Sequence, residues 1–244
     1  MAIGPDPRFS LRTGQMTHAE AEAAGIDVGL REYMLKVYNY MTTGLAFTGL
    51  VAYGVAQSEA AMQAIFGTPL FWVVALAPIG MVFFLSARIH AMQSSTAQML
   101  FWVYSALMGL SLASIFVVYT GTSIARVFFI TSATFAAMSI YGYTTKRDLS
   151  GFGSFLFMGL IGIIIASIVN LFLASSALQF VISVIGVLVF VGLTAYDTQA
   201  IKSVYSATDD GETHSKKAIM GALKLYLDFI NLFIMLLHLF GDRR

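Results

Sequence analysis

The sequence predicts an all-α integral membrane protein with seven transmembrane helices. Of its 244 residues, 58% are hydrophobic and only 11% are charged, whereas a soluble domain carries about 25% charged residues. The mean hydropathy is +0.78. Apolar runs long enough to cross a bilayer recur along the chain and are separated by short polar loops. Together these observations exclude a soluble globular protein.

The polar N-terminal end and the short loops set the domain organisation. Residues 1–32 form a polar tail, and residues 33–244 form the seven-helix transmembrane domain. The first apolar run begins only after this tail, so no cleavable signal peptide is visible. Short loops favour packing between consecutive helices and leave no room for a second domain.

Each predicted span is long enough to cross the hydrocarbon core at about 1.5 Å per residue. The second span opens with Thr68 and Pro69, which suit an N-cap and a first helical turn. Small residues in the third, fourth and fifth spans allow membrane helices to approach closely. The sixth and seventh spans each contain an aspartate. In order, the spans are residues 33–56, 68–87, 97–119, 123–143, 154–174, 178–200 and 218–240.

The distribution of Lys and Arg predicts the orientation, because cytoplasmic segments of membrane proteins are enriched in these residues. Only Arg126, Arg243 and Arg244 fall on one side of the predicted spans, and Lys224 lies inside the last span. The N-terminus is therefore predicted to be cytoplasmic and the C-terminus outside. The ten residues on the cytoplasmic side are Arg8, Arg12, Arg31, Lys36, Arg88, Lys146, Arg147, Lys202, Lys216 and Lys217.

The seventh span carries a polar stripe on an otherwise apolar helix. Asp228 lies near its middle, where an aspartate costs about 2.5–3.5 kcal/mol on membrane-insertion scales. We therefore expect an inner helix, wrapped by the others and lining either a polar contact or a water-filled path. At about 100° per residue, the side of the helix that carries Asp228 also holds Lys217, Gly221, Lys224, Asn231, Met235 and His238.

Asp197 in the sixth span is the second intramembrane carboxylate. It lies five residues before Lys202, about 8 Å from the cytoplasmic end of the span. Asp228 enters the membrane from the same side and reaches a similar depth. A short loop joins the two spans, so the two carboxylates are placed to meet.

A meeting of two carboxylates predicts a pH-sensitive contact. Two ionised carboxylates in hydrogen-bond contact at low dielectric cannot both stay charged, so the pair holds one proton. The protonated pair is a hydrogen-bonded latch between the two helices. In the deprotonated pair the two carboxylates repel each other, unless a neighbouring cation offsets the repulsion. Arg88, at the cytoplasmic end of the second span, and Lys224 are the candidate cations. Such a pair is a two-state element biased by pH.

A purely structural interpretation stays open for the same residues. A buried aspartate also fixes helix register by hydrogen bonding to a neighbour such as Thr194 or Tyr196. On this view Asn231 is an interhelical hydrogen-bond donor, His238 lies at the outer interface, and Arg88 extends toward the headgroups from its helix end.

At these residues the sequence resembles the Bax inhibitor-1 family, and it looks like a bacterial member. The resemblance spans nearly the whole membrane part and excludes the tail. The matching stretches are ALMGLSLASIF at 106–116, YGYTTKRDLS at 141–150, GLTAYDTQ at 192–199 and LYLDFINLF at 225–233.

The resemblance implies a seven-helix fold whose last helix is central and wrapped by two three-helix layers. It implies a pH-sensitive calcium leak gated by the pair at Asp197 and Asp228. It also implies a pore-lining arginine in the second helix, for which Arg88 is the match. Some bacterial relatives carry an arginine late in the last helix, where this chain has His238. A bacterial member belongs in the inner membrane, and some members modulate a membrane-bound protease.

Three function classes are therefore compared. The first is a leak channel for calcium, in which Asp197 and Asp228 bind the ion weakly and transiently. Calcium prefers six to eight oxygen ligands, so two carboxylates hold it loosely, which suits conduction. The second is a regulatory membrane protein, with a membrane protease as its possible partner and structural aspartates. The third is an intramembrane aspartyl protease, which also needs two facing aspartates.

The residues around the aspartates disfavour the protease. Leu225-Tyr226-Leu227 precedes Asp228, where that class has Gly-x-Gly, and no Pro-Ala-Leu motif follows. We therefore expect no enzymatic activity, although a proton-coupled transporter stays open. The expected partners are calcium ions, protons and the lipid bilayer. No cofactor is expected beyond calcium as the permeant ion, because no cysteine is present to form a thiolate site. The net charge of +1 and the lack of a basic patch predict no nucleic-acid partner.

Overall fold

The computed structural model describes residues 27–244, and within this range every named secondary-structure element is a helix. Most of the predicted tail thus lies outside the described residues. The helices are α2 (Val28–Ala56), α3 (Glu59–Phe66), α4 (Leu70–Arg88), the short 3₁₀ helix η1 (Ile89–Ala91), α5 (Ser94–Leu112), α6 (Ile115–Val118), α7 (Gly121–Thr144), α8 (Ser150–Leu173), α9 (Ser176–Ser203) and α10 (Gly211–Phe240).

Six of these helical segments are long and apolar enough to cross a membrane. They are Leu70–Ala91, Ser94–Val118, Gly121–Thr144, Ser150–Leu173, Ser176–Ser203 and Gly211–Phe240. The protein is therefore an all-α membrane protein, and the six segments match the second to seventh predicted spans. The first predicted span corresponds to α2, which has 29 residues but is not among the six. That span stays a prediction.

Helix caps explain where the helix ends differ from the predicted spans. The Asp27 side chain accepts a hydrogen bond from Leu30 N at 2.9 Å, so α2 begins five residues before the predicted span. Asp210 accepts one from Thr213 N at 3.0 Å, and α10 therefore begins at Gly211 rather than at 218. Helix α3, a short helix capped by Ser58, is not among the predicted spans. Hydropathy locates the membrane-crossing part of a helix, and caps extend the helix beyond it.

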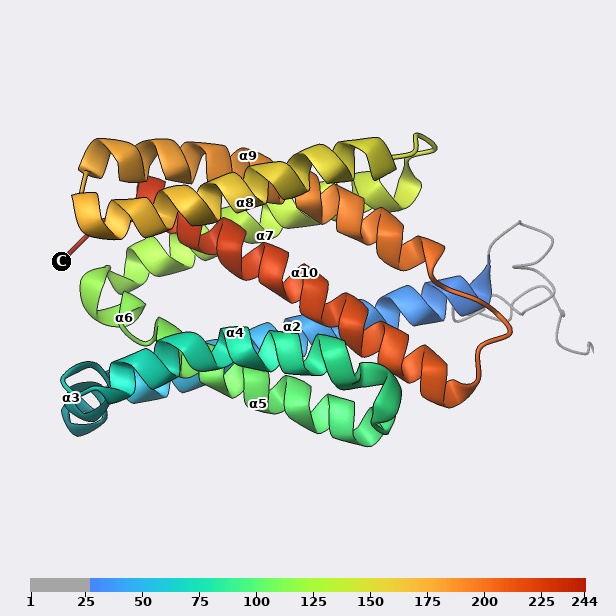
Figure 1. The fold of residues 1–244 in the computed structure, drawn as a ribbon, viewed down its shortest axis with the longest axis horizontal. Coiled ribbons are helices and arrows are strands. Elements are labelled where there is room, and N and C mark those ends of the chain that lie inside the picture. The colour runs from blue at the N-terminus through green and yellow to red at the C-terminus, as the bar shows by residue number, and fades with distance from the viewer. Residues whose placement is uncertain (1–26) are drawn as a thin grey trace, which may run out of the picture.

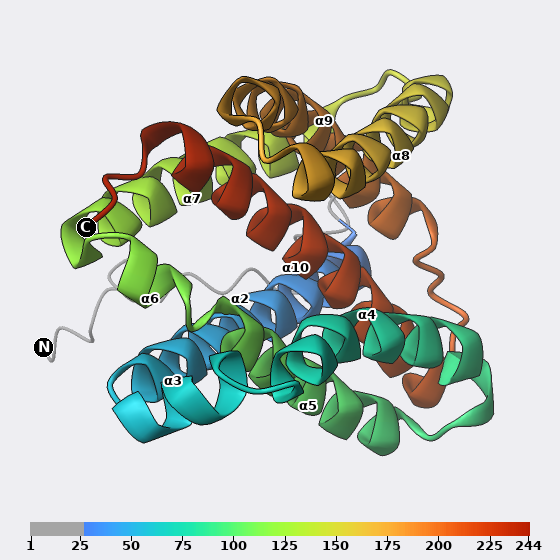
Figure 2. The same ribbon diagram turned by 60° about the vertical axis from the view of Figure 1, so that its left-hand side comes forward.

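Helix α10 connects two groups of helices. It contacts α2 and α5 on one side and α7 and α9 on the other. Within the first group α5 packs against α2 and α4, and within the second α9 packs against α7 and α8. Figures 1 and 2 show α10 running obliquely between the two groups.

Burial separates α10 from the outer helices. In its most apolar stretch 67% of the residues are buried, whereas the corresponding value for α8 is 11%. Helix α10 is therefore largely enclosed, as its sequence predicts, but its polar stripe is not buried throughout, because Gly221 and Asp228 are buried whereas Lys224 and His238 are exposed. By contrast, α8 exposes large side chains such as Phe157, Leu171 and Phe172.

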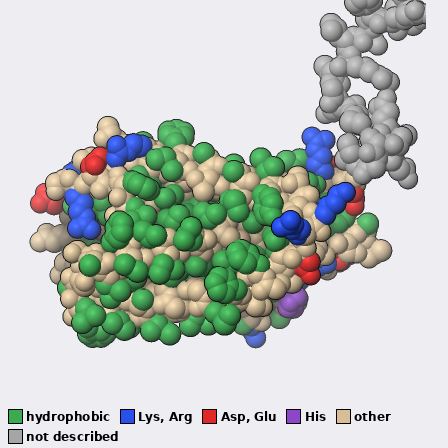
Figure 3. All heavy atoms as spheres, turned by 90° about the horizontal axis from the view of Figure 1, so that it is seen from above, with side chains coloured by type: hydrophobic (Ala, Val, Ile, Leu, Met, Phe, Trp, Pro, Cys, Tyr) green, Lys and Arg blue, Asp and Glu red, His purple; other side chains and the backbone are tan. Residues whose placement is uncertain are grey.

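The outer surface carries the apolar band that a bilayer requires. Hydrophobic side chains cover the middle of the face in Figure 3, and charged side chains gather toward its two ends. An apolar surface of this extent is not tolerated in water, and in a bilayer it contacts acyl chains.

Candidate functional site

The contact between α9 and α10 positions the two intramembrane aspartates. It is the most extensive helix–helix contact among the described residues. Two glycines allow the close approach: a Cβ on Gly221 would lie 3.1 Å from Ile201, and one on Gly186 would lie 2.8 Å from Met235. These contacts fix an antiparallel register in which Asp197 falls opposite the turn that contains Lys224.

Asp197 lies on α9 with its side chain 15% exposed. Lys224 Nζ on α10 lies 3.8 Å from Asp197 Oδ1, and the lysine side chain is 52% exposed. The carboxyl group also interacts with that of Asp228, one turn further along α10. The structure therefore brings two carboxyl groups and one ammonium group together.

Asp228 is the more enclosed of the two aspartates, because only 4% of its surface is exposed. Its Oδ2 atom has no hydrogen-bond partner among the described residues. The charged groups that act on it are Asp197 and Lys224. An ionised carboxylate without a full set of donors is costly at such a position, so the chemistry favours a proton shared between the aspartates.

The aspartates line a cavity of about 950 Å³ between α8, α9 and α10, which we call the aspartate cavity. Its wall is mostly apolar, with residues such as Phe157, Ile164 and Leu193. Since a water molecule occupies about 30 Å³ in the liquid, the cavity has room for many waters. The polar residues of its wall are Ser154, Ser167, Tyr196, Asp197, Lys224, Asp228 and Asn231.

Asn231 lies in this wall, and the side-chain hydrogen bond that it makes among the described residues stays within α10. Its Nδ2 donates to the carbonyl oxygen of Leu227 at 2.8 Å, one turn earlier on the same helix. The structural interpretation expected an interhelical donor here, and that expectation is wrong. The amide oxygen of Asn231 is a hydrogen-bond acceptor in the cavity wall.

Arg88 and His238 are not among the residues that line the aspartate cavity. Arg88 is exposed at the end of α4, in the other helix group from α9. His238 Nδ1 lies 3.0 Å from Gln179 Nε2, near the far end of α10. Gln179 in turn accepts from Asn170 Nδ2 at 3.2 Å. Of the two candidate cations, Lys224 is the one placed beside the aspartates.

Two residues of the cavity wall were not singled out in the sequence, Ser154 and Ser167 of α8. Both belong to a helix with few polar side chains, and that scarcity is the signal that points to them. Their place at the cavity depends on how α8 lies against α9. Gly153 sets that approach, because a Cβ there would overlap the ring of Tyr196.

No group of three or more His, Cys, Asp or Glu side chains between residues 27 and 244 is arranged to hold a metal ion. The ligands that the aspartate cavity offers a cation are therefore its two carboxyl groups, the amide oxygen of Asn231, hydroxyl groups and water.

Comparison with known proteins identifies relatives along nearly the whole chain. The family described as "Inhibitor of apoptosis-promoting Bax1" matches residues 30–244. The inner membrane protein YbhL of Escherichia coli K12 is 53% identical over 219 residues, which cover 88% of this chain and 94% of YbhL. An uncharacterized protein of Rickettsia prowazekii is 52% identical over 218 residues, 89% of this chain and 92% of the relative. One from Caulobacter vibrioides is 44% identical over 236 residues, 93% and 94% of the two chains.

Proposed function

The chain belongs to the Bax inhibitor-1 family, and we propose that it forms a pH-sensitive cation leak across the bacterial inner membrane. Calcium is the proposed permeant ion, and Asp197 and Asp228 are the proposed gate. The observation that supports this most is the position of the two carboxyl groups, which meet inside one cavity of an otherwise apolar membrane protein.

The gate works through the charge of the pair. At low pH the aspartates share a proton, and the hydrogen-bonded pair holds α9 against α10. As the pH rises the proton leaves, and repulsion between two carboxylates at low dielectric biases the helices apart. Lys224 limits this repulsion because its ammonium lies 3.8 Å from Asp197. The open state is therefore favoured at higher pH.

Calcium passes such a gate through weak binding. The deprotonated pair supplies two carboxylates, and water supplies the remaining oxygens of a six- to eight-fold shell. The volume of the aspartate cavity, about 950 Å³, is large enough for a partly hydrated ion. Weak binding lets the ion leave again, which conduction requires.

We also propose the full topology of seven spans, with α2 as the first, a cytoplasmic N-terminus and α10 at the centre of two three-helix layers. At 29 residues α2 is about 43 Å long, enough to cross a bilayer. It lies against α5 and α10 and exposes large apolar residues such as Phe47 and Leu50. These features support a membrane-crossing position.

The test is calcium flux into proteoliposomes that contain a calcium-sensitive dye, measured between pH 6 and pH 8. The leak rate of the unmodified chain is expected to rise with pH. Asp197→Asn and Asp228→Asn are expected to flatten this dependence, since neither variant can form a pair of negative charges. Asp148→Asn is the matched control, because Asp148 is an exposed carboxylate in the loop before α8.

Two results would overturn the proposal. One is a rate equal to that of empty liposomes at every pH. The other is an unchanged pH dependence in both aspartate variants. Either result favours the regulatory role, in which the aspartates are structural and a membrane-bound protease is the partner to be sought.

A further inference from the structure

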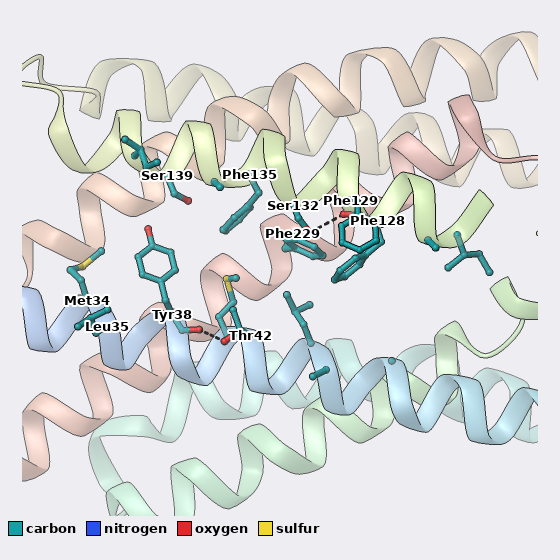
Figure 4. A pocket seen from close by; sticks show the side chains of 18 of the residues that line it. Met34, Leu35, Tyr38, Thr42, Phe128, Phe129, Ser132, Phe135, Ser139 and Phe229 are labelled. Carbon is teal, nitrogen blue, oxygen red and sulfur yellow. Dashed lines mark hydrogen bonds between the residues drawn. The ribbon is translucent and has the colours of Figure 1, made fainter. Parts of the chain in front are cut away.

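A second large cavity lies on the side of α10 away from the aspartates. It is a groove of about 980 Å³ between α2 and α7, with Phe229 of α10 in its floor, and we call it the α2–α7 groove. Figure 4 shows its side chains reaching inward from both helices. Helices α2 and α7 both pack on α10 but make few contacts with each other, so the groove is open along its length.

The wall of the groove changes character from one end to the other. Arg31 lies at the end where α2 begins, and Tyr38 follows two turns later, about 10 Å further along the helix. Beyond Tyr38 the wall is almost wholly apolar, with Leu45, Phe128 and Phe129. The groove is therefore cationic at one end, polar next to it and apolar for the rest of its length.

Ser139 is an unusual member of the wall. It is only 5% exposed, and its Oγ atom has no hydrogen-bond partner among the described residues. In Figure 4 its hydroxyl group points from α7 into the groove, and the hydroxyl of Tyr38 points toward it from α2. A buried hydroxyl without a partner costs free energy, which a ligand with a hydrogen-bond acceptor at this level would recover.

We propose that the α2–α7 groove binds one anionic phospholipid from the leaflet at the Arg31 end. The phosphate lies at Arg31, an ester carbonyl accepts from Ser139 and Tyr38, and one acyl chain follows the apolar wall. None of the described residues that line the groove is acidic, so the charge of Arg31 is complementary to an anionic headgroup.

The length of the groove fits this occupant. From Tyr38 to Gly49, near the far end, α2 advances by eleven residues, or about 16 Å. The hydrocarbon part of one leaflet is half of about 30 Å. An acyl chain whose ester lies beside Tyr38 thus reaches the far end of the groove at the middle of the bilayer.

The test uses a phosphatidylglycerol with a photoreactive diazirine in its acyl chain, incorporated with the protein into nanodiscs. After illumination, mass spectrometry locates the labelled peptides. Labelling is expected to concentrate on α2 and α7, and Gly49→Trp is expected to reduce it at least fivefold. A Cβ at Gly49 would meet no atom within 4 Å, and Gly49 lines the groove, so the groove offers space for the added side chain.

Gly54→Trp is the matched control. Gly54 lies on the same helix, also meets nothing within 4 Å and does not line the groove. Labelling of the Gly54→Trp variant is expected to equal that of the unmodified chain. In native mass spectrometry, Arg31→Gln is expected to lower the preference for phosphatidylglycerol over phosphatidylcholine about fivefold, because one basic residue near a membrane surface contributes about that factor.

Uniform labelling of all lipid-facing helices would overturn the proposal, as would equal labelling of the Gly49→Trp and Gly54→Trp variants. A further contrary result is a dimer in which α2 and α7 of two copies cross-link and which the Gly49→Trp substitution dissociates. The groove would then be an interface between two copies of the chain. Size-exclusion chromatography of each variant shows whether it keeps its fold.

Discussion

Lys224 Nζ and Asp197 Oδ1 lie 3.8 Å apart across the contact between α9 and α10. The lysine comes one turn before Asp228 on the same helix, so α10 supplies both a carboxyl group and a cation to the site. The ammonium favours the ionised aspartates, whereas burial favours a protonated pair. The balance between these effects sets the pH at which the proposed gate opens.

The Lys224→Gln variant is expected to leak calcium only at higher pH than the unmodified chain. Without the ammonium the pair keeps its proton to higher pH, and the closed state persists. The midpoint of the flux-against-pH curve should rise by about one pH unit, equivalent to roughly 1.4 kcal/mol. Lys216→Gln removes a lysine that lies outside the cavity and serves as the control. A constant midpoint would show that Lys224 does not act on the gate, and a lower midpoint would show that its main effect is to limit the repulsion between the carboxylates.

Asp228→Asn is expected to keep or increase thermal stability while it flattens the pH dependence of the leak. Asp228 is 4% exposed, and one of its carboxyl oxygens has no partner among the described residues, so removal of the carboxyl group relieves roughly 1–3 kcal/mol of desolvation. The melting temperature in detergent at pH 7 measures this. A marked drop would instead indicate that Asp228 is a structural residue that holds the bundle together.

Two buried tyrosines of the core provide a matched pair of substitutions. Tyr226 OH lies 2.6 Å from Thr48 Oγ1, whereas Tyr104 OH has no partner among the described residues. The two rings contact each other edge to face with centroids 5.2 Å apart. Tyr226→Phe should therefore lower the free energy of unfolding by about 1 kcal/mol, and Tyr104→Phe should leave it unchanged or raise it. Equal losses in the two variants would contradict this assignment of the hydrogen bond.

The proposed topology places Gln57 and Ala207 on opposite sides of the membrane. Gln57 follows α2, and Ala207 lies in the loop between α9 and α10. The chain has no cysteine, so single Cys substitutions give unambiguous sites for a membrane-impermeant maleimide. Gln57→Cys should react in intact cells and Ala207→Cys only after permeabilisation. Protection of both positions in intact cells would mean that α2 does not cross the membrane.

Much of the fold follows from patterns that lie within single segments. Apolar runs locate the membrane-crossing part of each helix, because the hydrocarbon core demands about 20 apolar residues. The isolated charge of Asp228 predicts an enclosed α10, since a carboxylate is not tolerated against lipid. The ends of the helices could not be read in this way. They depend on side-chain caps at Asp27 and Asp210, which lie in water outside the apolar runs.

The candidate site likewise has features that follow from the sequence and features that depend on helix packing. The positions of Asp197 and Asp228 along the chain already place both carboxylates within membrane-crossing segments and at similar depths, because depth follows from the rise per residue. Which cation lies beside the two aspartates depends instead on how the helices pack. Lys224 lies in that place because it shares α10 with Asp228, whereas Arg88 is carried by α4 into the other helix group.

The α2–α7 groove could not be predicted from the sequence, because it forms only where two helices pack on α10. Its wall combines residues about 100 positions apart, such as Tyr38 and Ser139, on helices that make few contacts with each other. Periodicity within one helix determines which side chains share a face. Which two faces confront each other, and whether side chains fill the space between them, is set by the packing of both helices on α10.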